Sequence, residues 1–233
     1  MRKELLINEN WLFRYFDGSE TMLDLPHTWN AIDGQDGGND YKRGTCVYTK
    51  AFSAPECFSD ERVYLEFRGV NASAKVVLNG AVMTTHDGGY STFRCDITEY
   101  LKPENELIVE VDNSKNDRVY PQKADFTFYG GIYRDVKLII VNQNHFDLDH
   151  FGGPGIAVHA KVDGKDASVW VRTWHNAENG TVSIRLKDAD GNVVASGQGT
   201  DAEILIPDVH LWDGLEDPYL YTCEATLTAD GVA

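Results

Sequence analysis

One carboxylate in this chain precedes a pair of glycines at a point where the backbone is expected to bend. Within "ADFTFYGGIYRDVKLIIV" (residues 124–141), Asp125 lies five residues before Gly130-Gly131. A glycine pair beside a strand is typical of a bulge or of a close approach between backbones. The apolar run over residues 136–141 predicts the strand that follows. The residues alone therefore predict a bend into a buried strand. They leave Asp125 as either a solvated loop carboxylate or a functional one.

The cysteines and histidines form no recognisable metal or disulfide pattern. Cys46, Cys57, Cys95 and Cys223 show no C-x-x-C spacing and no histidine at zinc-site spacing. At this density we expect free thiols in a reducing compartment, and a cytoplasmic location is the default. The N-terminal residues show no apolar core of the signal-peptide kind, which agrees with that expectation. His27, beside a turn proline, is typical of a structural histidine.

Charge and composition narrow the classes of partner. The chain has 233 residues, with 21 Lys and Arg against 37 Asp and Glu, and a formal net charge of −16. Such an acidic chain lacks the positive surface that nucleic acids and anionic membranes require. No window approaches the ~18 apolar residues of a membrane span. A hydrophobic share of 42% with 11% aromatics predicts a globular protein of one large or two modest domains.

Alternation of apolar and polar residues, and not a helical period, dominates the first part of the chain. In residues 62–68 apolar and charged side chains alternate, which predicts a half-buried strand. Apolar runs flank Asn79-Gly80, a pair that accepts positive φ at both positions of a hairpin turn. Residues 107–111 predict a further strand with glutamates on its opposite face. These elements predict an all-β fold.

A polar segment rich in glycine, residues 142–155, predicts a domain junction near residues 141–147. Short strands at sandwich spacing follow, separated by Gly and Asn turns, and they favour a second antiparallel sandwich of the immunoglobulin type. We therefore expect two domains, over residues 1–142 and 143–233. Trp170 and Trp174 have even spacing on one predicted strand, so we expect both to pack in its core.

Six motifs in order resemble one known family. The chain is similar along its whole length to the N-terminal half of family 2 glycoside hydrolases, most of all the β-galactosidase branch. The resemblance implies a jelly-roll sugar-binding domain over residues 1–142, followed by an immunoglobulin-like domain over residues 143–233 that lacks its last strand. The motifs are "NENWLFRYFDG" (8–18), "LPHTWN" (25–30), "GTCVYTKAFSAP" (44–55), "VVLNG" (76–80), "YGGIYRDV" (129–136) and "LWDGLEDPYLY" (211–221).

The resemblance implies that the catalytic residues lie outside this chain. In the family a TIM barrel carries both catalytic carboxylates, which retaining hydrolysis needs about 5 Å apart. Asn8-Glu9 and Asn105-Glu106 match the family's Asn-Glu pair in type, but neither is expected at a barrel strand end. We therefore expect an inactive N-terminal part of a retaining β-glycosidase, above all a β-galactosidase. A β-glucuronidase or β-mannosidase parent and a stand-alone carbohydrate-binding protein are the alternatives.

The resemblance also implies which residues touch the sugar. In family β-galactosidases the aspartate before the "GIYR"-type motif helps to bind galactose and a sodium ion, and Asp125 falls at that position. The loop over residues 36–48 is expected to reach the substrate pocket through Asn39, Tyr41 or Arg43. The family asparagine is replaced just before Gly44, which departs from the pattern. No cofactor is expected in this part, whereas the full-length enzyme could hold Na+ or Mg2+ and form a homo-oligomer.

Overall fold

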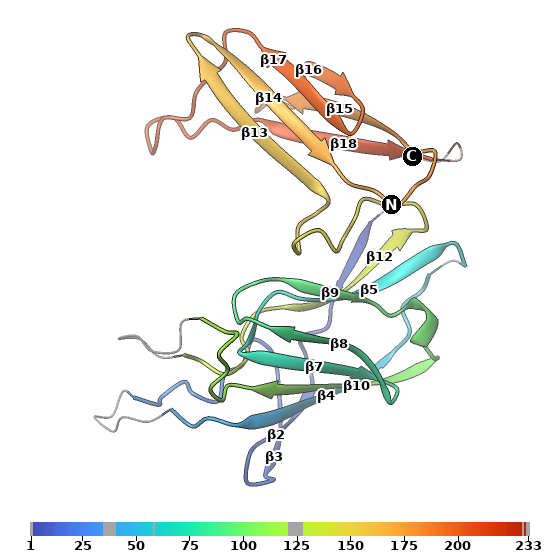
Figure 1. Ribbon diagram of the computed structural model, residues 1–233, viewed down its shortest axis with the longest axis vertical. Helices are drawn as coiled ribbons and strands as arrows, with labels where there is room; N and C mark the ends of the chain where they lie inside the picture. The colour runs from blue at the N-terminus through green and yellow to red at the C-terminus, as the bar shows by residue number, and fades with distance from the viewer. Residues whose placement is uncertain (1, 35–40, 58, 121–127, 230, 232–233) are drawn as a thin grey trace. The chain divides into compact units, whose positions relative to one another are not determined.

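The computed structural model describes residues 2–34, 41–57, 59–120, 128–229 and 231 (Figure 1). In these ranges the secondary structure consists of strands and one short 3-10 turn, so the all-β prediction is confirmed. No helix in the described ranges is long and apolar enough to cross a membrane. The chain divides into two compact units, Met1–Gln143 and Asn144–Ala233.

The first unit is a jelly-roll sandwich of two main sheets. The larger sheet has the strand order β3-β2-β4-β10-β7-β8, the smaller has the order β1-β12-β5-β9, and β11 pairs with β6 in a short ribbon. The strands are β1 (Lys3–Leu6), β2 (Trp11–Arg14), β3 (Glu20–Leu23), β4 (Thr45–Ser53), β5 (Glu61–Phe67), β6 (Val70–Asn71), β7 (Ser73–Leu78), β8 (Ala81–Asp87), β9 (Phe93–Asp96), β10 (Glu104–Asp112), β11 (Gly131–Ile132) and β12 (Val136–Asn142), with the 3-10 turn η1 at Thr98–Tyr100.

Alternating apolar side chains from both sheets form the core of this unit. Leu107, Val109 and Val111 of β10 are fully buried, as their alternation with glutamates predicts. The β7–β8 hairpin is confirmed, and Asn79 and Gly80 adopt φ of 51° and 88° at its turn. The positive φ values explain why this pair occupies the turn.

Strand β5 differs from the half-buried strand that its alternation predicts. Its second face is covered as well, and Tyr64 and Glu66 are buried there. Glu66 is tolerated because its carboxylate lies 2.6 Å from Nε of Arg94 on β9, and both side chains are nearly inaccessible to solvent. The charged residue that suggested an exposed face is one half of a buried ion pair.

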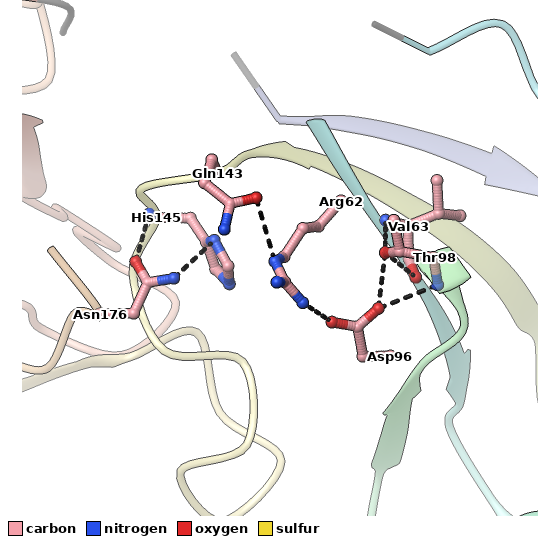
Figure 2. A network of polar contacts seen from close by, with 7 residues as sticks. All are labelled: Arg62, Val63, Asp96, Thr98, Gln143, His145 and Asn176. Atoms are coloured by element: carbon pink, nitrogen blue, oxygen red, sulfur yellow. Dashed lines mark hydrogen bonds and ion pairs between the residues drawn. The ribbon is translucent and has the colours of Figure 1, made fainter. Parts of the chain in front are cut away.

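A polar network closes one end of the smaller sheet (Figure 2). Arg62 Nη1 lies 2.5 Å from Asp96 Oδ2, and Arg62 Nε donates to Gln143 Oε1 at 3.2 Å. Thr98 donates to Asp96 through its hydroxyl at 2.6 Å and its backbone N–H at 3.0 Å. Burial raises the pKa of Asp96, but hydrogen bonds from Thr98 and Arg62 outweigh burial and lower it. The network fixes β5, η1 and the end of β12 together.

The second unit is a smaller sandwich of two three-stranded sheets, ordered β13-β14-β17 and β16-β15-β18. Its core consists of apolar residues from β14, β15 and β17, including Val169, Ile184 and Ile204. Among the described residues β18 pairs with β15 alone and is an edge strand. The strands are β13 (Ile156–Asp163), β14 (Asp166–Thr173), β15 (Thr181–Lys187), β16 (Val193–Gln198), β17 (Asp201–Ile206) and β18 (Thr222–Thr228).

The tryptophans of this unit are not where the spacing argument placed them. Val169 and Val171 of β14 point into the core, so Trp170 lies on the opposite face of the sheet, where it is half-buried. Trp174 follows the end of the strand and stacks on His150 with ring centroids 3.8 Å apart. Trp212 is 63% exposed. The prediction of a tryptophan core in this unit was wrong because the valines occupy it.

Candidate functional site

The loop that precedes β4 brings two of the predicted sugar contacts together. The Arg43 guanidinium lies 5.4 Å from the centroid of the Tyr41 ring, and Tyr41 meets Phe128 edge-on at 6.1 Å. Arg43 also donates from Nη1 to the carbonyl of Asn113 at 3.1 Å. Arg43 is exposed and Tyr41 is half-buried. The pair therefore presents one aromatic ring and one cation side by side.

The other two predicted contacts, Asn39 and Asp125, lie outside the described residues. The described chain resumes at Phe128, which touches Tyr41. Phe128 therefore lies beside the loop that carries Tyr41 and Arg43.

The glycine pair allows the backbone to approach a second segment, as the sequence predicts. His27 N–H donates to the Ile132 carbonyl at 2.8 Å, and Trp29 N–H donates to the Gly130 carbonyl at 3.3 Å. A Cβ on Gly130 would overlap the Trp29 ring. Gly131 has a φ of +129°, and a Cβ there would lie 2.6 Å from the His27 carbonyl oxygen. Both glycines are therefore required by close packing against residues 27–29.

His27 has a structural position. Its Nδ1 lies 2.8 Å from the hydroxyl of the fully buried Tyr48, and its ring packs edge-on against Phe13 at 4.6 Å. Burial lowers the pKa of His27 and raises that of Tyr48, so both groups are held neutral. A neutral imidazole can accept or donate in this bond. The pair stabilises the segment that packs against the glycine turn, Gly130-Gly131.

Two buried asparagines that the residue patterns do not single out lie beneath the loop. Asn30 ends the motif "LPHTWN", and Asn113 directly follows β10. Their side chains are joined by a 3.1 Å hydrogen bond from Asn113 Nδ2 to Asn30 Oδ1. Asn30 belongs to one of the family motifs, but an asparagine in a sequence predicts a loop and not a buried position. The sequence could have indicated the buried position only through the nearby backbone groups, which need hydrogen-bond partners.

The two Asn-Glu pairs have structural roles. Asn8 donates to Asp135 at 2.9 Å and accepts from the Val136 N–H at 2.9 Å, which fixes the start of β12. Asn105 is buried and bonds to Lys102 and other backbone groups at the start of β10. Each pair offers a single carboxyl group, whereas retaining hydrolysis requires two about 5 Å apart. Among the described residues no group of three His, Cys, Asp or Glu side chains is placed to hold a metal ion.

A separate polar groove of about 730 Å3 lies over the outer face of β7, β8 and β10. Most of its charged side chains pair with one another. Arg118 Nε lies 2.7 Å from Asp87, and Lys75 Nζ lies 3.2 Å from Glu110. The cations of the groove are each paired with a carboxylate, whereas the Tyr41 and Arg43 loop offers a ring and a cation. The loop is therefore the better candidate for a ligand contact.

Comparison with known proteins identifies the family of the chain. Residues 31–142 match the family profile described as "Glycosyl hydrolases family 2, sugar binding domain", and residues 154–233 match "Glycosyl hydrolases family 2". A β-glucuronidase of Bacteroides fragilis is 35% identical over 99% of this chain and 36% of its own length. A β-galactosidase of Thermoanaerobacter pseudethanolicus is 28% identical over 96% of this chain and 31% of its own length.

A solved structure is similar over the entire chain. The crystal structure of an FMN-binding β-glucuronidase from Faecalibacterium prausnitzii L2-6 has a TM-score of 0.92 and 41% identity, covering 100% of this chain and 38% of that one. The chain thus spans about a third of the length of the relatives it matches. The family resemblance inferred from the motifs is confirmed. The chain belongs to glycosyl hydrolase family 2.

Proposed function

We propose that this chain is the non-catalytic N-terminal part of a retaining β-glycosidase that removes a terminal sugar. The observation that carries the proposal is the coverage. The relatives match this chain over nearly its whole length, and the chain matches about a third of theirs. The matched part corresponds to the sugar-binding domain and the following β-sandwich. The acid and the nucleophile that retaining hydrolysis requires would then lie in the remaining two thirds.

Within that enzyme, the loop with Tyr41 and Arg43 would contribute to sugar binding. An aromatic ring offers an apolar face to a sugar, and a guanidinium donates several hydrogen bonds in a fixed geometry. Asn39 and Asp125 belong to the same proposal, as does a sodium ion with Asp125 as one of its ligands. A hard cation such as Na+ or Mg2+ takes oxygen ligands, and a carboxylate supplies them.

Two sugars are candidates, and each has support. β-Galactosidases and β-glucuronidases both occur among the relatives at similar coverage. A glucuronide carries a carboxylate that a galactoside lacks, and Arg43 is an exposed guanidinium beside an aromatic ring. Guanidinium and carboxylate groups form strong charge-assisted hydrogen bonds. Arg43 therefore supports β-glucuronidase activity as a second candidate beside β-galactosidase activity.

The test uses the complete polypeptide that contains this chain. It would be assayed with nitrophenyl β-galactoside and nitrophenyl β-glucuronide under the same conditions. The proposal expects cleavage of at least one of them with retention of anomeric configuration, which NMR of the first product measures. A complete protein that cleaves neither substrate, or that inverts the configuration, would contradict the proposal.

A further inference from the structure

Asn30 is fully buried and uses the whole hydrogen-bonding capacity of its side-chain amide. Its Oδ1 accepts from the Gly130 N–H at 2.8 Å and from Asn113 Nδ2 at 3.1 Å. Its Nδ2 donates to Asp33 Oδ2 at 2.6 Å and to the Lys42 carbonyl at 3.2 Å. A carboxamide has two donor hydrogens and two acceptor lone pairs, so all four are engaged. Two of these partners, Asn113 and Gly130, are far from Asn30 in the sequence.

Asn113 extends the same connection to the loop. Its Oδ1 accepts from the Gly44 N–H at 2.9 Å, and its Nδ2 also approaches the Lys42 carbonyl at 3.2 Å. Its backbone carbonyl accepts the bond from Arg43 at 3.1 Å. Lys42 and Gly44 are therefore bound to the two side-chain amides, and Arg43 is bound to the backbone carbonyl of Asn113. We call Asn30 and Asn113 the amide bridge.

Further hydrogen bonds surround the amide bridge. Trp29 Nε1 donates to the Lys42 carbonyl at 3.1 Å, and the Thr28 hydroxyl donates to the Gly130 carbonyl at 2.8 Å. Asp33 accepts from the Lys42 N–H at 2.8 Å, and this bond is the main cause of its lowered pKa. Asn30 and Asn113 themselves are buried, so an unmade hydrogen bond of either side chain is costly.

We propose that Asn30 is a positioning residue that sets the loop at residues 41–44 against the turn at residues 128–131. Through it, Tyr41 and Arg43 are presented at a fixed place beside Phe128. The inference rests on the proposed function, because it assigns these loops to sugar binding. The position requires donors and acceptors on one rigid group. Aspartate at position 30 has the same shape but no donor, and it would face the carboxylate of Asp33.

Asn105 supplies a matched control at the opposite end of β10. It is 4% exposed, compared with 0% for Asn30. Its Oδ1 accepts from the Lys102 N–H and from Asn79 Nδ2, both at 2.9 Å, and its Nδ2 donates to the Lys102 carbonyl at 2.7 Å. The substitution Asn105→Asp removes the same donor from an equally buried network. It does so away from the loop.

The first arm of the test is hydrogen exchange on the 233-residue chain, which needs no enzymatic activity. In Asn30→Asp we expect the amides of Gly44 and Gly130 to exchange at least about tenfold faster, because the new carboxylate lacks the amide donor and repels Asp33, which displaces the acceptors of both amides. In Asn105→Asp these two amides should keep their wild-type rates, while the amide of Lys102 exchanges faster. Unchanged exchange of Gly44 and Gly130 in Asn30→Asp would overturn the proposal.

The second arm is kinetics in the complete enzyme. We expect Asn30→Asp to raise KM at least about fivefold with a smaller change in kcat, since a displaced loop weakens sugar binding. Partial unfolding would instead lower kcat at constant KM, and that result would overturn the positioning role. Asn105→Asp should change KM less than about twofold. The double variant Asn30→Asp/Asp33→Asn should have a KM between those of Asn30→Asp and the wild type, because it removes the facing carboxylate.

The two arms separate the inference from the proposed function. If the wild-type enzyme cleaves neither glycoside, the proposed function fails, and the exchange arm still decides whether Asn30 holds the loop and the turn together. If exchange rises as expected while KM stays constant in an active enzyme, the amide bridge exists but does not position sugar-binding groups. That outcome would overturn the inference and leave the proposed function standing.

Discussion

Nδ1 of His27 lies 2.8 Å from the hydroxyl of Tyr48 beneath the glycine turn. This pair joins the segment that carries Trp29 and Asn30 to the core strand β4. Because burial holds His27 neutral, the pair links the stability of the turn region to pH.

The first prediction concerns this pH dependence. The folded pKa of His27 is below its ordinary value of 6.5, so the unfolded chain binds more protons than the folded chain in acid. The free energy of unfolding should therefore be fully retained above pH 6.5 and should fall as pH drops through 6.5 toward the folded pKa. Denaturant titrations between pH 8 and 5 measure this free energy of unfolding.

His86 has a pKa lowered mainly by burial and contributes to the same trend, so variants are compared. The variant His27→Gln should show a weaker pH dependence than wild type between pH 7 and 5. An identical dependence in wild type and His27→Gln would contradict the assignment, and His86→Gln reports the share of the second histidine.

The second prediction compares two glycines with positive φ. Gly131→Ala should destabilise the first unit by more than the ~1–3 kcal/mol of backbone strain alone, because the new Cβ would meet the His27 carbonyl. Gly80→Ala serves as the control, since its φ is +88° and a Cβ there meets nothing within 4 Å. Thermal unfolding of both variants measures the difference. Equal losses of stability in Gly131→Ala and Gly80→Ala would contradict this prediction, because they would show that the chain moves to relieve the crowding at Gly131.

The third prediction concerns the buried ion pair of Glu66 and Arg94. Glu66→Ala leaves the guanidinium without this carboxylate in a buried setting and should cost about 3–5 kcal/mol. Glu110→Ala removes an exposed partner of Lys75 and should cost less than about 1 kcal/mol. Urea unfolding of both variants provides the comparison. A similar small loss in each would mean that Arg94 finds other partners or water.

The fourth prediction concerns Asp125 in the complete enzyme. If its carboxylate binds the sugar, Asp125→Ala should lower kcat/KM by about ten- to a hundredfold, which corresponds to one lost hydrogen bond to a charged group of roughly 1.5–3 kcal/mol. The melting temperature should stay at the wild-type value. Wild-type kinetics in Asp125→Ala would identify it as a solvated loop carboxylate.

Much of the fold follows from local patterns in the sequence. The hairpin at Asn79-Gly80 and strand β10 were predictable because turn chemistry and alternation are local properties. Gly130-Gly131 was predictable as a close approach for the same reason. The two-sided burial of β5 was not, since the charge of Glu66 indicates an exposed face until its partner on β9 is known.

The amide bridge could not be predicted from residue types. Asn30 is buried because its partners include Asn113 and Gly130, which are 83 and 100 residues away in the sequence. A polar residue at such a position is indistinguishable in sequence from a loop asparagine. Trp170 shows the converse, because a large apolar residue points away from a core that smaller valines fill.

The central claim is that this chain supports hydrolysis without performing it. The most direct measurement is the rate at which the purified 233-residue chain releases nitrophenol from the β-galactoside and the β-glucuronide. We expect the buffer rate with both, because the proposed function assigns the acid and the nucleophile to the part of the enzyme outside this chain. Turnover above the buffer rate that a substitution within residues 1–233 abolishes would contradict the claim.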